Sequence, residues 1–404
     1  MKIKVLLICF IIFILSCSNS KVIKVSSTEE LESLFENPQY FIEVQLTSGE
    51  YFLNAKSIID STCGNCEDPN IPIPATAGLI ISGKKIKLIG PIDKSAIIYT
   101  NSGYGLFVKN CDDCIIENLS ITGGIRDTSA FASDAAIVVK NSNAIIKNNK
   151  IYKNLGDSLL ISKNIVGIMG ICGRENSEIE IIENEILCNS WDGIALYRDS
   201  KALIFRNIID GIDKSGDRKP TGGRGVGIGV TWNAKAIIEE NLVTRYWKGI
   251  GIFVDSNCTI RNNIVENLIT WGIALWDAGK GEPVAKIENN IIYDVGACGV
   301  SITRSQASEE PGYLIGNIIV KAAQDSAYDS QDYYCYQCAL AEHDVPINFE
   351  IRENLFFNNR RATDDLPNYD LSEYEFYEQF TTKNQNWNSI PIYKKSIFYK
   401  DLFE

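Results

Sequence analysis

Short runs of apolar residues, each interrupted by an asparagine, recur along most of the chain. The segments IIENLSI, IIENEI, IFRNII, IRNNIV and IENNII each contain a short apolar strand, an asparagine and a second short strand. Successive asparagines are 22 to 37 residues apart. A shortest spacing that recurs, together with some longer spacings, is typical of a solenoid. Its turns have the same number of residues, except where loops are inserted. The nine asparagines are Asn118, Asn148, Asn184, Asn207, Asn241, Asn263, Asn290, Asn317 and Asn354.

We expect these asparagines to line one corner of the coil. Asparagine tolerates left-handed backbone geometry, and its side-chain amide both donates and accepts hydrogen bonds. Amides stacked on successive turns would therefore form a hydrogen-bonded ladder.

A second pattern follows a glycine in several repeats, in the segments GIALYRD, GIGVTWN, GIGIFVD, GIALWDA and GVSITRS. Their period-two alternation predicts half-buried strands. The predicted inward residues are Ile194, Leu196, Ile228, Val230, Ile250, Ile252, Ile273, Leu275, Val300 and Ile302. The predicted outward residues are Ala195, Gly229, Gly251, Ala274 and Ser301, followed by Tyr197, Thr231, Phe253, Trp276 and Thr303. Small residues beside aromatic ones predict a shallow outward trough.

Together these patterns resemble the pectin-lyase-like proteins, in particular the bacterial right-handed β-helix repeat proteins. The resemblance covers about residues 80–357. It implies an all-β fold, a single-stranded right-handed parallel β-helix with an N-terminal cap and an irregular C-terminal cap. It implies no single activity, because such solenoids include lyases, hydrolases, epimerases and binding proteins.

The N-terminal segment has the features of a targeting signal. Lys2 and Lys4 precede an apolar run, and the sequence Ile-Leu-Ser-Cys ending at Cys17 is similar to a lipobox. We therefore expect a lipoprotein signal peptide over residues 1–17 and lipidation of Cys17. An ordinary cleaved signal peptide stays open as the alternative. Lipidation would place the protein in the bacterial cell envelope, periplasmic or at the cell surface, with membrane contact through the lipid only.

The remaining boundaries follow from where the repeat begins and ends. We expect a linker and N-terminal cap over residues 18–79, the β-helix over 80–357 and the C-terminal cap over 358–404. Within the first cap, Thr28 to Glu36 is predicted to be a short helix with Ser27 as its N-cap. We expect a monomer.

Charge and cysteine content limit the partners. The net charge of -12 argues against nucleic acid, which requires a basic face, and it weakens the case for an anionic polysaccharide. Six cysteines form the CxxC pairs Cys63/Cys66, Cys111/Cys114 and Cys335/Cys338. We expect disulfides in an exported protein, although a zinc site or a redox motif stays open.

Aromatic and charged residues accompany the glycine strands. If the glycine strands align from turn to turn, these aromatic and charged residues lie on turns about 4.8 Å apart. They then form one strip suited to pyranose rings, whose C–H faces stack on aromatic planes. The alternative is that these aromatic residues pack against inserted loops. The predicted substrate-binding residues are Tyr197, Arg198, Arg224, Trp232, Phe253, Trp271, Trp276 and Arg304.

The candidate catalytic residues are carboxylates and lysine, because the single histidine, His343, cannot form a histidine metal cluster. A hydrolase would use two of Asp192, Asp199, Asp255 and Asp277, and a lyase would use Lys248 or Arg224 as base. The segment 218–224 faintly resembles the Arg-x-Pro-x-x-Arg element of pectate lyases, with one residue too many. No metal site is predicted, although the aspartates at 210, 213 and 217 could bind Ca²⁺.

These patterns predict an envelope-tethered protein that binds a polysaccharide or oligosaccharide and acts on it as a lyase or glycoside hydrolase. A non-catalytic surface glycan-binding or adhesion module is the alternative. Paired carboxylates, or a lysine or arginine above an acidic cation site, in a walled cleft would favour the enzyme.

Overall fold

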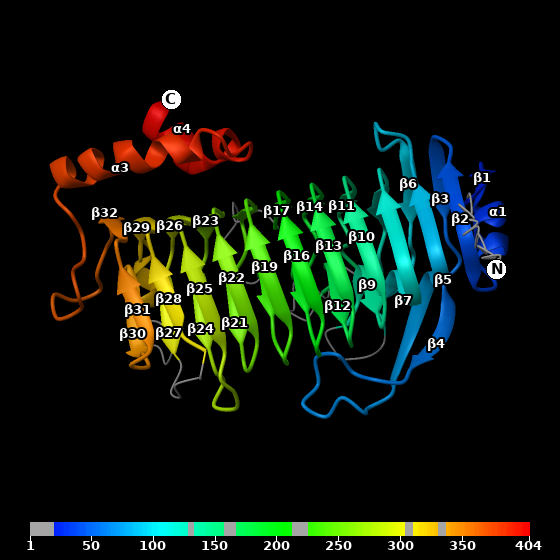
Figure 1. The fold of residues 1–404 in the computed structure, drawn as a ribbon, viewed down its shortest axis with the longest axis horizontal. Coiled ribbons are helices and arrows are strands. Elements are labelled where there is room, and N and C mark those ends of the chain that lie inside the picture. The colour runs from blue at the N-terminus through cyan, green and yellow to red at the C-terminus, as the bar shows by residue number, and fades with distance from the viewer. Residues whose placement is uncertain (1–19, 128–132, 157–166, 212–224, 304–309, 330–336) are drawn as a thin grey trace, which may run out of the picture.

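The chain winds into an elongated coil of stacked strands, with helices against one side near its C-terminal end (Figure 1). This computed structural model describes residues 20–127, 133–156, 167–211, 225–303, 310–329 and 337–404. Neighbouring turns pair in parallel, as between β21 (Lys248–Phe253) and β24 (Trp271–Trp276). The expected parallel β-helix is therefore confirmed.

Each full turn contributes three short strands, which form three faces of the coil. The first face contains β9 (Ala135–Lys140), β12 (Met169–Arg174), β15 (Ile194–Leu196), β18 (Val226–Val230), β21, β24, β27 (Cys298–Thr303) and β30 (Leu340–Asp344). The second contains β10 (Asn143–Lys147), β13 (Glu178–Ile182), β16 (Lys201–Phe205), β19 (Lys235–Glu239), β22 (Asn257–Arg261), β25 (Val284–Glu288), β28 (Gly312–Ile315) and β31 (Phe349–Arg352). In the early turns, the long strands β5 (Ile73–Ile89) and β7 (Tyr104–Glu117) pair with strands of both faces.

The third face is a separate sheet. It contains β3 (Gly49–Phe52), β6 (Ala96–Tyr99), β8 (Ser120–Thr122), β11 (Lys150–Tyr152), β14 (Glu185–Leu187), β17 (Ile208–Asp210), β20 (Leu242–Thr244), β23 (Ile264–Leu268), β26 (Ile291–Val295), β29 (Ile318–Ala322) and β32 (Leu355–Phe357). Apolar side chains from all three faces fill the interior and form one continuous core. The predicted inward residues belong to it: Ile228 and its register partners Ile194 and Ile250 are buried.

The asparagine ladder runs along the corner between the second and third faces. From Asn184 to Asn354 the predicted residues occupy it, with Asn184 Nδ2 3.0 Å from Asn207 Oδ1. The prediction for Asn148 is wrong by one residue, because Asn149 joins the ladder and donates to Asn184 Oδ1 at 3.1 Å. The prediction for Asn118 is wrong because Leu119 stands at the next ladder position, where its N–H donates to Asn149 Oδ1 at 3.0 Å. Asn118 and Asn148 form their own hydrogen bond of 2.7 Å.

The left-handed residue of this corner precedes the ladder position. Glu183, Arg206 and Glu240 have φ values of 55°, 56° and 53°, and each stands just before a ladder asparagine. Our expectation that the ladder asparagine itself adopts this conformation is therefore wrong. Asparagine is required at the ladder for its amide, because the amide satisfies buried backbone groups on neighbouring turns.

The N-terminal segment closes one end of the coil. Strand β1 (Lys21–Val25) pairs with β2 (Gln39–Leu46), and β2 pairs with β5. Between them lies α1 (Thr28–Leu34), whose first turn is capped by Ser27 as predicted. Residues 56–76 then form an arm on the first face. The arm contains β4 (Lys56–Asp60), which runs antiparallel to β5.

The C-terminal segment is more regular than the irregular cap that we expected. It contains α3 (Glu373–Trp387), η2 (Tyr393–Lys395) and α4 (Ile397–Phe403), which follow the short helix η1 (Ser326–Tyr328) of an earlier loop. The helices lie along the third face of the later turns, where Phe376 and Phe398 pack on an outward apolar surface (Figure 1). No helix in the described part of the chain is long and apolar enough to cross a membrane.

Candidate functional site

The candidate site is the outward surface of β18, β21 and β24 on the first face. Lys248 stands in register with Trp271, Gly251 with Ala274, and Phe253 with Trp276, as the sequence pattern predicted. We call this surface, with Asp192 at its edge, the outer strip. Its residues are Asp192, Gly229, Lys248, Gly251, Phe253, Trp271 and Trp276.

Asp192 directs one carboxylate oxygen over the outer strip. It lies just before β15, and its Oδ1 accepts a 2.7 Å hydrogen bond from the backbone N–H of Val226. A Cβ atom on Gly225 would lie 2.4 Å from Oδ1, so this glycine, with φ of 72°, permits the contact. A Cβ on Gly229 would lie 4.0 Å from Oδ2. Within the described residues, no donor lies within hydrogen-bond distance of Oδ2.

Burial changes the acid strength of this carboxyl group. The Asp192 residue is 7% exposed, and burial raises its pKa to about 7, while the N–H of Val226 and the charge of Lys248 act in the opposite direction. A carboxyl group with this pKa can gain or lose a proton near neutral pH, which is the requirement for a general acid or base.

Lys248 and two aromatic rings extend the outer strip beyond Asp192. The Lys248 ammonium lies 4.2 Å from the centre of the Trp271 ring, which is buried. Phe253 and Trp276 are half-buried and meet edge to face, with ring centres 6.2 Å apart. The Phe253 ring folds over Gly251, where a Cβ would lie 2.1 Å from the ring. The glycine therefore makes room for an aromatic surface at this level of the coil.

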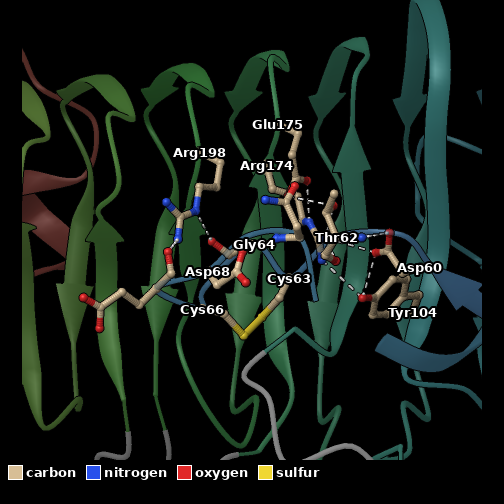
Figure 2. The surroundings of a disulfide bond; sticks show 12 residues. Asp60, Thr62, Cys63, Gly64, Cys66, Asp68, Tyr104, Arg174, Glu175 and Arg198 are labelled. Carbon is tan, nitrogen blue, oxygen red and sulfur yellow. Dashed lines mark hydrogen bonds and ion pairs between the residues drawn. A yellow bond between two sulfur atoms is a disulfide. The ribbon is translucent and has the colours of Figure 1, made fainter. Parts of the chain in front are cut away.

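Two predicted sugar-binding residues lie under the arm instead. Tyr197 is 5% exposed, and its hydroxyl contacts Met169 Sδ at 3.8 Å. The Arg198 guanidinium donates hydrogen bonds of 3.2 Å to the carbonyl oxygens of Gly64 and Glu67 (Figure 2). It also lies 4.3 Å from the centre of the Trp232 ring. These contacts join the arm to the coil, so Arg198 holds the arm in place on the coil.

The other predicted carboxylates lie in turns beyond the outer strip. Asp199 is exposed in the turn after β15. Asp255 Oδ1 accepts a 2.6 Å hydrogen bond from the N–H of Asn233, and Asp277 Oδ1 accepts one of 2.8 Å from the N–H of Gly279. Two of these side chains thus stabilise turns. The predicted residues Arg224 and Arg304, and the lipidation site Cys17, lie outside the described residues.

A buried ionic network under the arm had no signal in the sequence pattern. Asp60 pairs with Lys140 and with Arg174, whose guanidinium lies 3.1 Å from Asp60 Oδ2 (Figure 2). Arg174 also donates to the carbonyl oxygen of Thr62 at 2.6 Å, across 112 residues of sequence. All three charged side chains are at most 9% exposed. The network fixes the arm beside the outer strip.

The sequence analysis also missed a carboxyl pair at the base of the arm. Asp127 accepts hydrogen bonds from the N–H and hydroxyl of Thr76, and its own N–H donates to Asp134 at 3.0 Å. Burial and the neighbouring Asp127 charge raise the pKa of Asp134 to about 7. The pair anchors Thr76 to the coil.

The cysteine predictions are partly tested. Disulfides join Cys63 to Cys66 in the arm and Cys111 to Cys114 in β7, as expected. Cys335 lies outside the described residues, so the third pair stays a prediction.

The hypothesis of a calcium site finds no support from Asp210. Its carboxylate forms a two-pronged pair with Arg245, at 2.5 and 2.6 Å. Asp213 and Asp217 lie outside the described residues. In the parts of the chain that the structure describes, no three histidine, cysteine or acidic residues gather as a metal site.

The family model of the right handed beta helix region matches residues 57–218 and 217–310. These matches cover more than half of the chain, so the protein belongs to the right-handed β-helix family. No curated protein matches its sequence.

Several solved structures share the coiled architecture. The periplasmic alginate epimerase AlgG is 12% identical with a TM-score of 0.49, over 83% of this chain and 73% of that one. Pectate lyase Bsp165PelA from Bacillus sp. N165 is 13% identical with a TM-score of 0.42, over 91% and 93%. An exopolygalacturonase from Thermotoga maritima is 11% identical with a TM-score of 0.46, over 84% and 82%. At these scores the similarity carries over no site and no substrate.

Proposed function

We propose that this protein binds a polysaccharide across the outer strip and that Asp192 exchanges a proton with the bound sugar. The observation that carries the proposal is the Asp192 carboxyl group. One oxygen is fixed by the N–H of Val226, and the other is directed over the side-chain-free surface of Gly229. A polar group held in this way can meet a glycan hydroxyl or a glycosidic oxygen.

The aromatic residues supply the second part of the proposed site. Phe253 and Trp276 present rings on neighbouring turns, and pyranose C–H faces stack on such rings. Lys248 is in register with Val226, whose N–H holds Asp192, and its charge favours the ionised form of Asp192. This combination orients a sugar ring and places an acid beside it.

The arrangement favours Asp192 as proton donor over a symmetric carboxylate pair. Asp255 and Asp277 are hydrogen-bonded in turns, and Asp199 is exposed beyond β15. A two-carboxylate hydrolase would need a partner about 5 to 9.5 Å from Asp192. Among the described residues, the charged group that acts on the pKa of Asp192 is instead Lys248.

A glycan array followed by a product assay tests this function. The wild-type protein should bind a glycan on the array and release new reducing or unsaturated ends from it. Asp192→Asn should keep binding and lose turnover, whereas Glu180→Gln, an exposed site on the second face, should keep both. Full turnover by Asp192→Asn would remove Asp192 from the chemistry. Binding by the wild-type protein without any product would favour the non-catalytic module.

We also propose that a lipid on Cys17 tethers the protein to the bacterial cell envelope. The support is the sequence of the first 17 residues, in which two lysines, an apolar run and the Leu-Ser-Cys end occur in the order of a lipoprotein signal. A tethered solenoid of this kind would meet polysaccharides at the envelope.

A further inference from the structure

We propose that Asp127 and Asp134 share one proton, and that this proton fastens the base of the arm to the coil. Closure of the arm then depends on pH, whatever ligand the outer strip binds. The carboxyl groups concerned surround Thr76, the last residue of the arm.

The Asp127 carboxylate holds Thr76 through both of its oxygens. Asp127 lies in the segment after β8, and its Oδ2 accepts a 2.8 Å hydrogen bond from the N–H of Thr76. Its Oδ1 accepts a hydrogen bond from the Thr76 hydroxyl group. The oxygen of that hydroxyl group accepts a 2.9 Å hydrogen bond from the N–H of Gly103, just before β7. Asp127 therefore joins the base of the arm to the coil.

Asp134 is fully buried beside Asp127, just before β9. Its Oδ2 accepts a 3.0 Å hydrogen bond from the N–H of Asp127 and lies 3.4 Å from Arg126 Nη1. Its Oδ1 is buried and has no hydrogen-bond partner among the described residues. A Cβ atom on Gly103 would lie 2.8 Å from this oxygen and closer still to Asp127 Oδ2. The two carboxyl groups thus converge over Gly103.

A shared proton accounts for this arrangement. Two ionised carboxylates in one buried site repel each other, whereas a single proton lets one carboxyl group donate to the other. Burial raises the pKa of Asp127, and burial together with the Asp127 charge raises the pKa of Asp134 to about 7. The hydrogen bond between the two groups lowers the pKa of Asp127 and raises that of Asp134. Asp134 is therefore the group that carries the proton and donates it to Asp127.

The charge balance of the cluster favours the same state. Arg126, whose side chain is 6% exposed, is the cation that acts on the pKa of both carboxyl groups. Two carboxyl groups that share one proton carry one negative charge, which Arg126 balances. Loss of the proton would add a second negative charge to a buried site, and burying such a charge is costly.

The shared proton links closure of the arm to pH. When Thr76 leaves the coil, water reaches the carboxyl groups, and the pKa of Asp134 falls from about 7 towards its ordinary value of 3.8. Between these values the closed form binds more protons than the open form. The closed arm therefore loses stability as pH rises from about 4 to about 7, and the loss is constant at higher pH. Because the arm also contacts Arg198 beside the outer strip, the cluster is a pH-sensitive clasp for that border.

Hydrogen exchange at the backbone N–H groups of Thr76, Gly103 and Asp127 tests the proposal, because each of them donates within the cluster. Their protection, corrected for the intrinsic pH dependence of exchange, should fall at least about tenfold in the wild type between pH 5 and pH 7. Asp134→Asn cannot ionise and keeps an oxygen for the N–H of Asp127, so its fall should be less than about threefold. Asp192→Asn removes the aspartate of similar pKa on the outer strip and should keep the wild-type fall.

Three outcomes would overturn the proposal. The first is constant protection of these N–H groups between pH 5 and pH 7 in the wild type, a measurement that needs no variant to fold. The second is a fall of wild-type size in Asp134→Asn, because the titrating group would then lie elsewhere. The third is loss of the fall in Asp192→Asn, which would assign the effect to Asp192.

Discussion

Asn241 donates its side-chain amide to Oδ1 of Asn263 at 3.0 Å, and the same amide nitrogen donates to the carbonyl oxygen of Ile204 at 2.8 Å. Its own Oδ1 accepts two hydrogen bonds of 2.9 Å from Asn207, one from the backbone and one from the side chain. Asn241 is fully buried. Each ladder residue thus satisfies polar groups on the turns before and after it.

Replacing Asn241 by leucine should lower the free energy of unfolding by about 1–3 kcal/mol, because buried groups of Asn207, Asn263 and Ile204 lose their partners. Chemical denaturation measures this change. Asn388→Leu, at an exposed position after α3, is the matched control and should change stability little. Equal stability of the two variants would contradict a ladder that stabilises the coil.

The repeat made most of this fold predictable, because strand period and ladder spacing are local properties. The register of Phe253 with Trp276 followed from counting residues after each glycine. The ladder error at Asn148 arose where two asparagines stand together, since both fit the frame and only three-dimensional pairing selects Asn149.

The candidate site was only partly predictable. The sequence placed Asp192, Lys248 and the aromatic rings on one face, and the structure brings them together. It could not show that residues 56–76 fold back over Tyr197 and Arg198, because those contacts join residues more than 130 positions apart. The partners of Asp60 are equally remote in sequence, so no local pattern indicated a buried ion pair.

The arm should depend on Asp60. Asp60→Ala would leave Lys140 and Arg174 buried without this partner, and breaking a buried ion pair costs about 3–5 kcal/mol. Hydrogen exchange should therefore show residues 56–76 losing protection while the ladder keeps it. Asp364→Ala, at a fully exposed carboxylate, is the control. Unchanged protection of the arm would show that the network does not hold it.

Asp192 should link stability to pH. Its pKa rises from 3.8 in the unfolded chain to about 7 in the folded protein, so the unfolded chain releases this proton at lower pH. The group therefore lowers the free energy of unfolding progressively as pH rises from about 4 to about 7. The total loss is on the order of 4 kcal/mol, and it stays constant at higher pH.

Asp192→Asn keeps an oxygen that can accept the N–H of Val226 and cannot ionise. Its stability relative to the wild type should therefore be greater at pH 8 than at pH 4, as thermal or denaturant unfolding at both pH values would show. If the stability difference between Asp192→Asn and the wild type were the same at pH 8 and pH 4, the pKa of Asp192 would not be raised in the folded protein. In the wild type, a reaction that needs protonated Asp192 should also slow above pH 7.

Membrane attachment should depend on Cys17. Cys17→Ser should release the protein from membranes, because the proposed anchor is the lipid on that cysteine. Cys9→Ser, within the apolar run of the same segment, should leave attachment unchanged. Continued partition of Cys17→Ser with membrane lipid would reject the lipobox interpretation.

The affinity of Trp276→Ala for the glycan identified on the array tests the central claim most directly. Trp276 is half-buried on the outer strip, whereas Tyr374 is a 75% exposed aromatic residue on α3 and serves as the matched control. We predict that Trp276→Ala weakens binding by about 1 kcal/mol or more, roughly fivefold, with the fold intact, and that Tyr374→Ala binds as the wild type does. Equal affinity of Trp276→Ala and the wild type would contradict a glycan site on the outer strip.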